Sequence, residues 1–255
     1  MEFISFVKSL TLKTMKKILF FTSILLLFLL ISCNEIDNFK VPNCTVKGQI
    51  IDAETGLPFE SRIADNIALV RMLEDNPAYP NPAYVNMKIM ENGTFSDNSL
   101  PATAYKFYLQ KVPMVNSDTV RVQLSASTPQ TVVIKGIPYL RIAMNVVHDS
   151  LVFSITKPAA VSYTGNITEI FAMYDNNSRV NDVFTSTLDS TLCSISFTPA
   201  TQVYVLDKKW SFQLKKVFPT IKPGKYYFRM CARLSGADSD RRNYSPTIEA
   251  VYQGQ

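Results

Sequence analysis

Residues His148, Asp149 and Ser150 stand side by side and supply the three side-chain types of a hydrolase triad. A triad needs the serine to meet the histidine, and the histidine to meet the acid, within hydrogen-bond distance. Consecutive residues of a strand point to opposite faces, so these three side chains are not expected to converge. His148 is the only histidine of the chain. The sequence therefore predicts no triad built on histidine, here or elsewhere.

Acidic side chains are the other groups that could carry chemistry. Two carboxylates about 5–10 Å apart across a cleft would suit glycoside hydrolysis, and sequence alone leaves that arrangement open. Asp52 and Glu54 fall in a turn cluster that ends at Gly56. We interpret both as solvated or turn-stabilising, because calcium needs a denser set of oxygen ligands. We expect a non-enzymatic protein with no metal and no cofactor.

Aromatic residues are the candidates for ligand binding. The segment NPAYPNPAY, residues 76–84, repeats Asn-Pro-Ala-Tyr and places Tyr79 and Tyr84 on a proline-stiffened loop. Two such rings could stack on sugars at little conformational cost, or pack on their own domain. Trp210, the only tryptophan, alternates with Phe212 and Leu214. That spacing favours an inward-facing core row over a ligand platform, although Trp210 is kept as a candidate contact.

The cysteines give a weaker signal. Beyond Cys33 the chain has Cys44, Cys193 and Cys231, with no Cys-x-x-Cys pair and no Cys/His cluster that would indicate zinc. Cys193 and Cys231 are the plausible disulfide partners, since both fall in the C-terminal half. The odd number favours small buried thiols instead.

The N-terminus combines a basic start with a short apolar run. Lys16 and Lys17 precede the apolar stretch 18–31, whose fourteen residues are fewer than the roughly 20 needed to span a bilayer. Leu30-Ile31-Ser32-Cys33 then resembles the lipobox of bacterial lipoproteins. We predict a signal peptide at 1–32, with Met15 the natural start, lipidation of Cys33 and a tether at 33–43. An uncleaved anchor or an ordinary secretion signal is the alternative.

Charge gives no indication of nucleic-acid binding. The chain has a formal net charge of +5, but residues 1–32 hold four lysines and one glutamate. The remaining 223 residues carry 22 basic and 20 acidic side chains, a net charge of +2, scattered without a basic run.

Alternating apolar residues predict strands throughout the mature chain, and no window gives a convincing helical stripe. The N-terminal set comprises the segment around residues 46–50 and the ranges 68–72, 85–90, 104–110, 119–124 and 131–135. The C-terminal set comprises residues 151–155, 167–173, 193–197, 210–214, 226–233 and 246–252. Many short strands with turn signals indicate β-sandwiches. We predict an all-β protein of two tandem sandwiches, at 44–136 and 137–255.

The first set opens with Val46-Lys47-Gly48-Gln49-Ile50-Ile51-Asp52, followed by Thr55-Gly56-Leu57-Pro58. This resembles the start of the prealbumin-like, carboxypeptidase-regulatory sandwich. Asn92-Gly93-Thr94-Phe95 and Tyr105 match its later half, with a longer turn at residues 102–104. Gly56 would supply a positive φ in the turn.

The C-terminal stretch Ile221–Ala232 is similar to the E–F corner and F strand of fibronectin type III domains. The resemblance implies that Tyr226 is the corner tyrosine and that Phe228, Met230 and Ala232 face the core. In that register Cys231 faces away from the core, whereas Cys193 faces inward, which further weakens the case for a disulfide.

A lipobox followed by these two domains resembles a family of two-domain lipoproteins of glycan-foraging Gram-negative bacteria. The resemblance implies a lipid-anchored outer-membrane protein that faces the exterior and binds carbohydrate or assists a Sus-type glycan-uptake system. Its partners would be a glycan, or an outer-membrane transporter or glycan-binding protein. A structural lipoprotein that docks on an outer-membrane complex is the alternative. The family carries no known functional residues to transfer.

Overall fold

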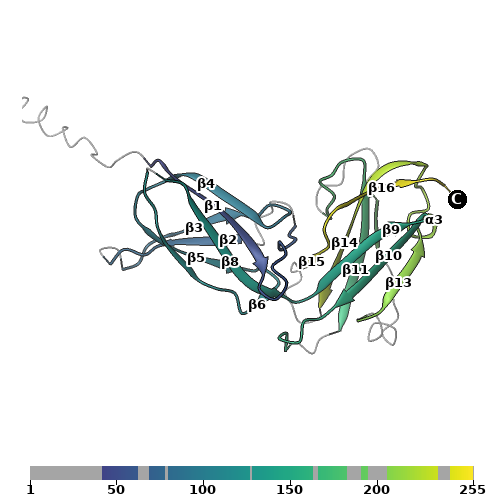
Figure 1. The fold of residues 1–255 in the computed structure, drawn as a ribbon, viewed down its shortest axis with the longest axis horizontal. Helices are drawn as coiled ribbons and strands as arrows, with labels where there is room; N and C mark the ends of the chain where they lie inside the picture. The colour runs from purple at the N-terminus through teal and green to yellow at the C-terminus, as the bar shows by residue number, and fades with distance from the viewer. Residues whose placement is uncertain are drawn as a thin grey trace, which may run out of the picture. The chain divides into compact units, whose positions relative to one another are not determined.

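The computed structural model describes residues 42–62, 69–77, 80–126, 128–162, 166–182, 191–194, 206–234 and 242–254. The predicted lipidation site Cys33 and the loop residue Tyr79 lie outside these ranges. Within them the chain is built almost entirely of strands arranged as packed sheets, which confirms the all-β, sandwich-like prediction (Figure 1).

Two four-stranded sheets form the N-terminal half. The first has the order β4-β1-β8-β6, with β1 and β8 parallel and the other pairs antiparallel. The second, entirely antiparallel, has the order β3-β2-β5-β7. Their bounds are β1 Cys44–Asp52, β2 Leu69–Glu74, β3 Tyr84–Lys88, β4 Thr94–Leu100, β5 Ala104–Gln110, β6 Met114–Val115, β7 Val120–Gln123 and β8 Gln130–Pro138.

One hydrophobic cluster joins the facing sides of these two sheets. Val46 and Ile50 of β1 meet Val70 of β2 and Phe107 of β5, and all four are buried. Burial on alternate residues of β1 follows the two-residue period of a strand. Apolar side chains at every second position are therefore what hold the two layers together.

Two glycines of β1 and its turn have distinct physical roles. Gly56 has a φ of +72°, as predicted for the turn after β1. Gly48 sits under the ring of Phe95 on neighbouring β4, where an added Cβ would lie 2.0 Å from the ring carbon Cζ. The absence of a side chain at Gly48 lets the buried ring lie against the strand backbone.

The C-terminal half contains a three-stranded and a five-stranded sheet. The orders are β13-β10-β9 and β12-β11-β14-β15, with β16 also pairing with β14. Their bounds are β9 Arg141–Val147, β10 Ser150–Thr156, β11 Ile167–Asp175, β12 Thr191–Ser194, β13 Lys209–Gln213, β14 Gly224–Leu234, β15 Asn243–Tyr244 and β16 Ile248–Tyr252; the short helix α3 spans Leu214–Val217.

A second large cluster fills this half. Phe153 of β10, Tyr174 of β11 and Phe228 of β14 are buried in it, and the Tyr174 and Tyr226 rings meet edge to face at 5.2 Å. Ile137, at the expected boundary between the halves, lies inside β8 and belongs to this cluster.

The two faces of β14 are both buried, which sequence alternation alone did not indicate. Phe228, Met230 and Ala232 face the large cluster, as expected. Cys231 points to the other face, as expected, but is itself fully buried in a third cluster with Met173, Val180 and Tyr244. Cys231 is a free thiol, and burial raises its pKa.

Strands β4 and β9 were absent from the sequence prediction. In β4 only Phe95 and Leu100 are buried, and in β9 only Ile142 is, so neither has a strong apolar alternation. Both are held mainly by backbone pairing, to β1 and to β10 respectively.

Candidate functional site

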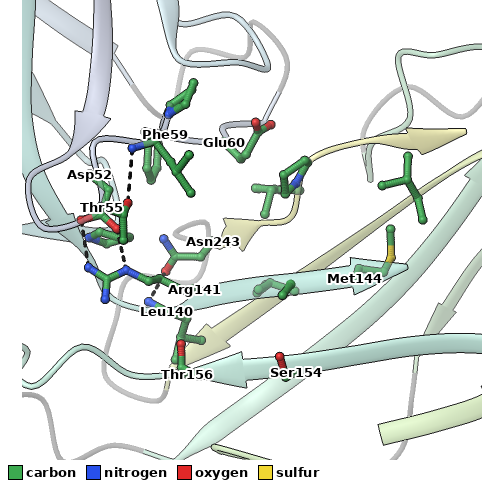
Figure 2. A pocket seen from close by; sticks show the side chains of 18 residues that line it. Asp52, Thr55, Phe59, Glu60, Leu140, Arg141, Met144, Ser154, Thr156 and Asn243 are labelled. Carbon is green, nitrogen blue, oxygen red and sulfur yellow. Dashed lines mark hydrogen bonds and ion pairs between the residues drawn. The ribbon is translucent and has the colours of Figure 1, made fainter. Parts of the chain in front are cut away.

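A pocket of about 560 Å³ opens where β1, β9, β10 and β16 come together (Figure 2). Its volume is within the range of about 300–1,000 Å³ that is typical of small-molecule sites. The apolar part of its lining includes Leu57, Pro58, Phe59, Ala143, Met144 and Ile248. Polar groups enter from Asp52, Thr55, Glu60, Arg141, Ser154, Thr156 and Asn243.

Arg141, the first residue of β9, is held in the pocket by two carboxylates. Its Nε and Nη2 atoms lie 2.5 and 2.9 Å from the two carboxylate oxygens of Asp52, and Nη2 also donates to Glu54 at 2.7 Å. A bidentate guanidinium–carboxylate pair fixes both position and plane. The Nη1 amino group donates to no other residue that the structure describes, so it is available to a ligand.

The pKa of Asp52 reflects this arrangement. Burial alone would raise the pKa, but hydrogen bonds from Arg141, the Glu54 N–H and Thr55 bring it below its ordinary value. The hydrogen bonds from Arg141 to the carboxylates of Asp52 and Glu54, opposed by desolvation, raise the pKa of Arg141. The pair therefore stays ionised at neutral pH.

Two hydroxyls reach the pocket from β10. Phe153 and Ile155 turn into the core, and the two-residue period therefore directs Ser154 and Thr156 to the opposite face. Figure 2 shows both side chains projecting from this one strand toward the pocket. A hydroxyl both donates and accepts hydrogen bonds, which suits a ligand that carries hydroxyls of its own.

The guanidinium of Arg229 on β14, which contacts the pocket-lining residues Glu60 and Tyr244, is fully buried, with 0% of the residue exposed. It donates to the carbonyl oxygens of Ser61 at 2.7 Å and Ser245 at 3.0 Å, and to the Glu60 carboxylate at 3.3 Å. Its face lies 4.8 Å from the ring centre of Tyr244. One buried cation thus joins the segment after β1 to β14 and the segment after β15.

The pKa of Glu60 is raised because the carboxyl group is buried. Burial raises this pKa to about 7; the charge of Arg229 opposes the shift, and the charge of Glu91 adds to it. Glu91 itself has a raised pKa through burial, and its Oε1 has no hydrogen-bond partner among the residues described. Glu60 lines the pocket as well as bonding Arg229, so it links the pocket wall to the buried cation.

A chain of ion pairs continues from this cluster. Asp182 accepts from Arg62 at 3.0 Å, from Arg242 at 2.9 Å and from the Tyr244 hydroxyl at 2.7 Å. Arg242 also bonds Glu169 at 2.8 Å. Networks of this kind hold their members in one arrangement, and Tyr244 is the member that also lines the pocket.

Two of the predicted ligand-binding residues, Tyr84 and Trp210, lie elsewhere. Tyr84 is half exposed on β3, and the Arg71 guanidinium covers its ring at 3.7 Å. Trp210 is partly buried on β13 against the C-terminal cluster and is stacked with Phe212 at 6.3 Å. Neither lines the pocket. Ligand binding at these rings stays a prediction.

His148 and Asp149 are not on a strand, contrary to the sequence interpretation. They are the two central residues of the β9–β10 hairpin, with φ of +46° and +57°, which matches a tight hairpin turn. Asp149 accepts the N–H of Gln253 at 2.9 Å. Only Ser150 lies on the following strand.

The pocket escaped the sequence analysis because its lining comes from segments near residues 52–60, 138–156 and 243–248. The turn residues Asp52 and Glu54 were singled out, but the partner that gives them a role, Arg141, is 89 and 87 residues away. A lone arginine that begins a weak strand carries no local signal of such a contact.

Among the residues that the structure describes, no group of three acidic, histidine or cysteine side chains is placed to hold a metal ion. Nor does any helix in those ranges have the length and apolar character to cross a bilayer.

No family model matches the sequence, and no curated protein matches it. Solved structures do share its fold. DUF3823 family proteins from Bacteroides uniformis and Parabacteroides merdae superimpose with TM-scores of 0.63 and 0.60, at 16% and 18% identity. A candidate carbohydrate-binding protein from Bacteroides uniformis gives 0.56 at 19% identity. Each alignment covers 82% of this chain and 99% of the other. At these identities the likeness shows the fold alone.

Proposed function

We propose that the protein is a non-enzymatic, lipid-anchored carbohydrate-binding protein of the outer-membrane surface, acting with a glycan-uptake system. The observation that carries the proposal is the pocket, which combines apolar walls with hydroxyls and a fixed guanidinium. The fold is shared with a protein described as a candidate carbohydrate-binding protein, which supports the same conclusion.

A sugar has apolar C–H faces and a rim of hydroxyls, and the pocket offers partners for both. Leu57 and Pro58 supply an apolar surface on one wall. Arg141 supplies the Nη1 donors, and Ser154 and Thr156 supply groups that donate and accept. Asp52 keeps the guanidinium in place and is a positioning residue, because only 7% of its side chain is exposed.

Blocking the pocket tests the proposal. Ala143 is exposed on β9 and lines the pocket, so Ala143→Trp fills the space without disturbing the core. Val147, also exposed and four residues further along the same strand, lies outside the lining and gives the matched control Val147→Trp. Calorimetry or affinity electrophoresis against a panel of uncharged polysaccharides should show binding by the wild type and the control, and none by Ala143→Trp.

A second change probes the hydroxyls separately. Ser154→Ala combined with Thr156→Val removes two hydrogen-bonding groups while nearly preserving shape. At roughly 1 kcal/mol for each lost hydrogen bond, binding should weaken by about tenfold or more. Unchanged affinity would mean that the sugar does not sit against β10.

A structural, protein-docking lipoprotein is the second candidate function. The observation that favours it is β3, which stands at the edge of its sheet and carries the exposed side chains of Tyr84 and Val85. An edge strand with free backbone groups can accept a partner strand. Co-purification with an outer-membrane transporter, lost on Val85→Pro, together with indifference to every glycan, would favour this role over carbohydrate binding.

A further inference from the structure

The outward face of the β3-β2-β5-β7 sheet gathers basic side chains that are far apart in the sequence. Arg71 on β2 pairs in register with Asn86 on β3 and Tyr108 on β5. Lys106 on β5 pairs in register with Arg121 on β7. Paired residues share one face of a sheet, and the inward positions Met72 and Phe107 are buried. These side chains therefore lie on the outer face.

We define this basic sheet face by Arg71, Lys106, Arg121 and Lys88, which lies on β3 opposite Leu69 and two residues from Asn86, and so on the same face. Among the residues described, Asp75 is the carboxylate that is ion-paired with these cations. Asp75 bonds both Lys106, at 2.5 Å, and Arg121, at 3.1 Å. Glu74 falls on the inward register, opposite Tyr105. Four cations against one carboxylate leave an excess positive charge. Arg121 has 67% of its side chain exposed, so this charge is open to solvent.

An aromatic ring is built into the same face. Tyr84 is opposite Leu73 at the β3 edge, and the Arg71 guanidinium lies 3.7 Å from its ring centre. Arg71 Nε also donates to Asn86 Oδ1 at 3.3 Å. A guanidinium stacked on a tyrosine and braced by an amide is held in plane, which prepares it to meet a carboxylate or sulfate.

We propose that the basic sheet face is a second binding site, which takes acidic polysaccharides bearing uronate or sulfate groups. Neighbouring strands are about 4.8 Å apart, so the four strands present cations across about 14 Å. That width matches an extended polyanion better than a single small anion. Arg71 covers one face of the Tyr84 ring, but the residue is half exposed, and its exposed surface can take a sugar next to the cation that meets the acidic group of that sugar.

The chemistry of the face favours a saccharide over a lipid surface. Binding in the membrane interface relies on exposed Trp, Phe or Leu side chains that enter the acyl region. The outward positions of β2 and β5 instead hold Arg71, Lys106, Tyr108 and Gln110, while Leu69 is buried and Leu73 is only partly exposed. A charged and hydroxyl-bearing plane is suited to a polar, hydrated chain.

The test compares polygalacturonate with its fully methyl-esterified form, which has the same backbone without the charge. We expect the protein to bind polygalacturonate, with affinity that falls as salt rises, and to bind the ester at least about tenfold more weakly. The variant Arg71→Gln/Lys88→Gln/Arg121→Gln should lose at least about tenfold in affinity for polygalacturonate.

The control variant Lys47→Gln/Lys135→Gln/Lys209→Gln removes the same charge from exposed residues on β1, β8 and β13. It should keep most of the affinity, as should Ala143→Trp, which blocks only the pocket. Equal loss in the two triple variants would overturn the proposal, because net charge alone would then explain binding. Equal binding of the ester, loss in Ala143→Trp, or tighter binding to phosphatidylglycerol vesicles than to polygalacturonate would overturn it too.

Discussion

Replacing Arg229 with methionine should be among the most destabilising single changes available in this fold. The guanidinium is fully buried and donates to the carbonyls of Ser61, Ser245 and Val180 and to the Glu60 carboxylate. Methionine is close to arginine in length but donates nothing. The change therefore leaves several buried acceptors without partners while keeping most of the packing.

The contacts set the size of the effect. Removing one partner of a buried ion pair typically costs about 3–5 kcal/mol when the other charge stays buried. Glu60, whose pKa is already raised to about 7, can take up a proton when Arg229 is removed, which reduces this cost at neutral pH. Buried carbonyls that lose their donor add about 1–3 kcal/mol, less whatever water or relaxation restores. We therefore expect Arg229→Met to lower the free energy of unfolding by about 4 kcal/mol or more, a large part of the stability of an ordinary domain.

Urea denaturation, followed by circular dichroism and by the fluorescence of the single Trp210, measures this directly. Lys225→Met is the matched control, since Lys225 is on the same strand and bonds Glu249 at 2.8 Å with both side chains exposed. Exposed ion pairs contribute little, so the control should leave the unfolding midpoint unchanged.

The double variant Arg229→Met/Glu60→Gln separates the cost of the unpaired Glu60 charge from the cost of the lost hydrogen bonds to buried carbonyls. If the uncompensated carboxylate accounts for much of the loss, removing it should restore part of the stability. An unfolding midpoint for Arg229→Met no lower than that of Lys225→Met would refute the view that this buried cation holds the segments around the pocket together.

Three other predictions follow from local geometry. Gly48→Ala puts a Cβ 2.0 Å from Phe95 Cζ and should cost about 1–3 kcal/mol in an unfolding titration; a loss similar in size in a Phe95→Leu background would contradict the clash. Because the folded-state pKa of Glu60 is raised from 4.5 to about 7, the native state holds the extra proton. Stability should therefore fall as pH rises from about 4.5 to 7, and comparison with Glu60→Gln, whose slope should be flatter, isolates this contribution from that of Glu91. Cys33→Ser should release the protein from membranes with its fold intact, and continued membrane attachment on fractionation would contradict the lipid anchor.

The strands could be predicted where one face is strongly apolar. Alternation in β10, around Leu151 and Phe153, and in β5, around Phe107, is a local property, and the structure keeps both segments as strands. The turn glycine Gly56 was predictable for the same reason, since its conformation depends on its immediate neighbours.

The functional surfaces could not be predicted in this way, because they depend on long-range pairing. Arg229 is followed and preceded by apolar residues, and its burial is possible only because partners 168 and 16 residues away supply acceptors. The basic sheet face is hidden by an overall composition close to neutral, and only strand order brings Arg71 and Arg121 onto one surface. Local periodicity identifies strands, whereas register determines which side chains share a site.

We have proposed that the pocket beside Arg141 binds a saccharide. Isothermal calorimetry on the wild type, Ala143→Trp and Val147→Trp with a panel of uncharged polysaccharides measures this binding. We expect saturable binding to at least one of them, abolished by Ala143→Trp and retained by Val147→Trp. Binding that survives Ala143→Trp, or no binding to any polysaccharide by the wild type, would contradict it.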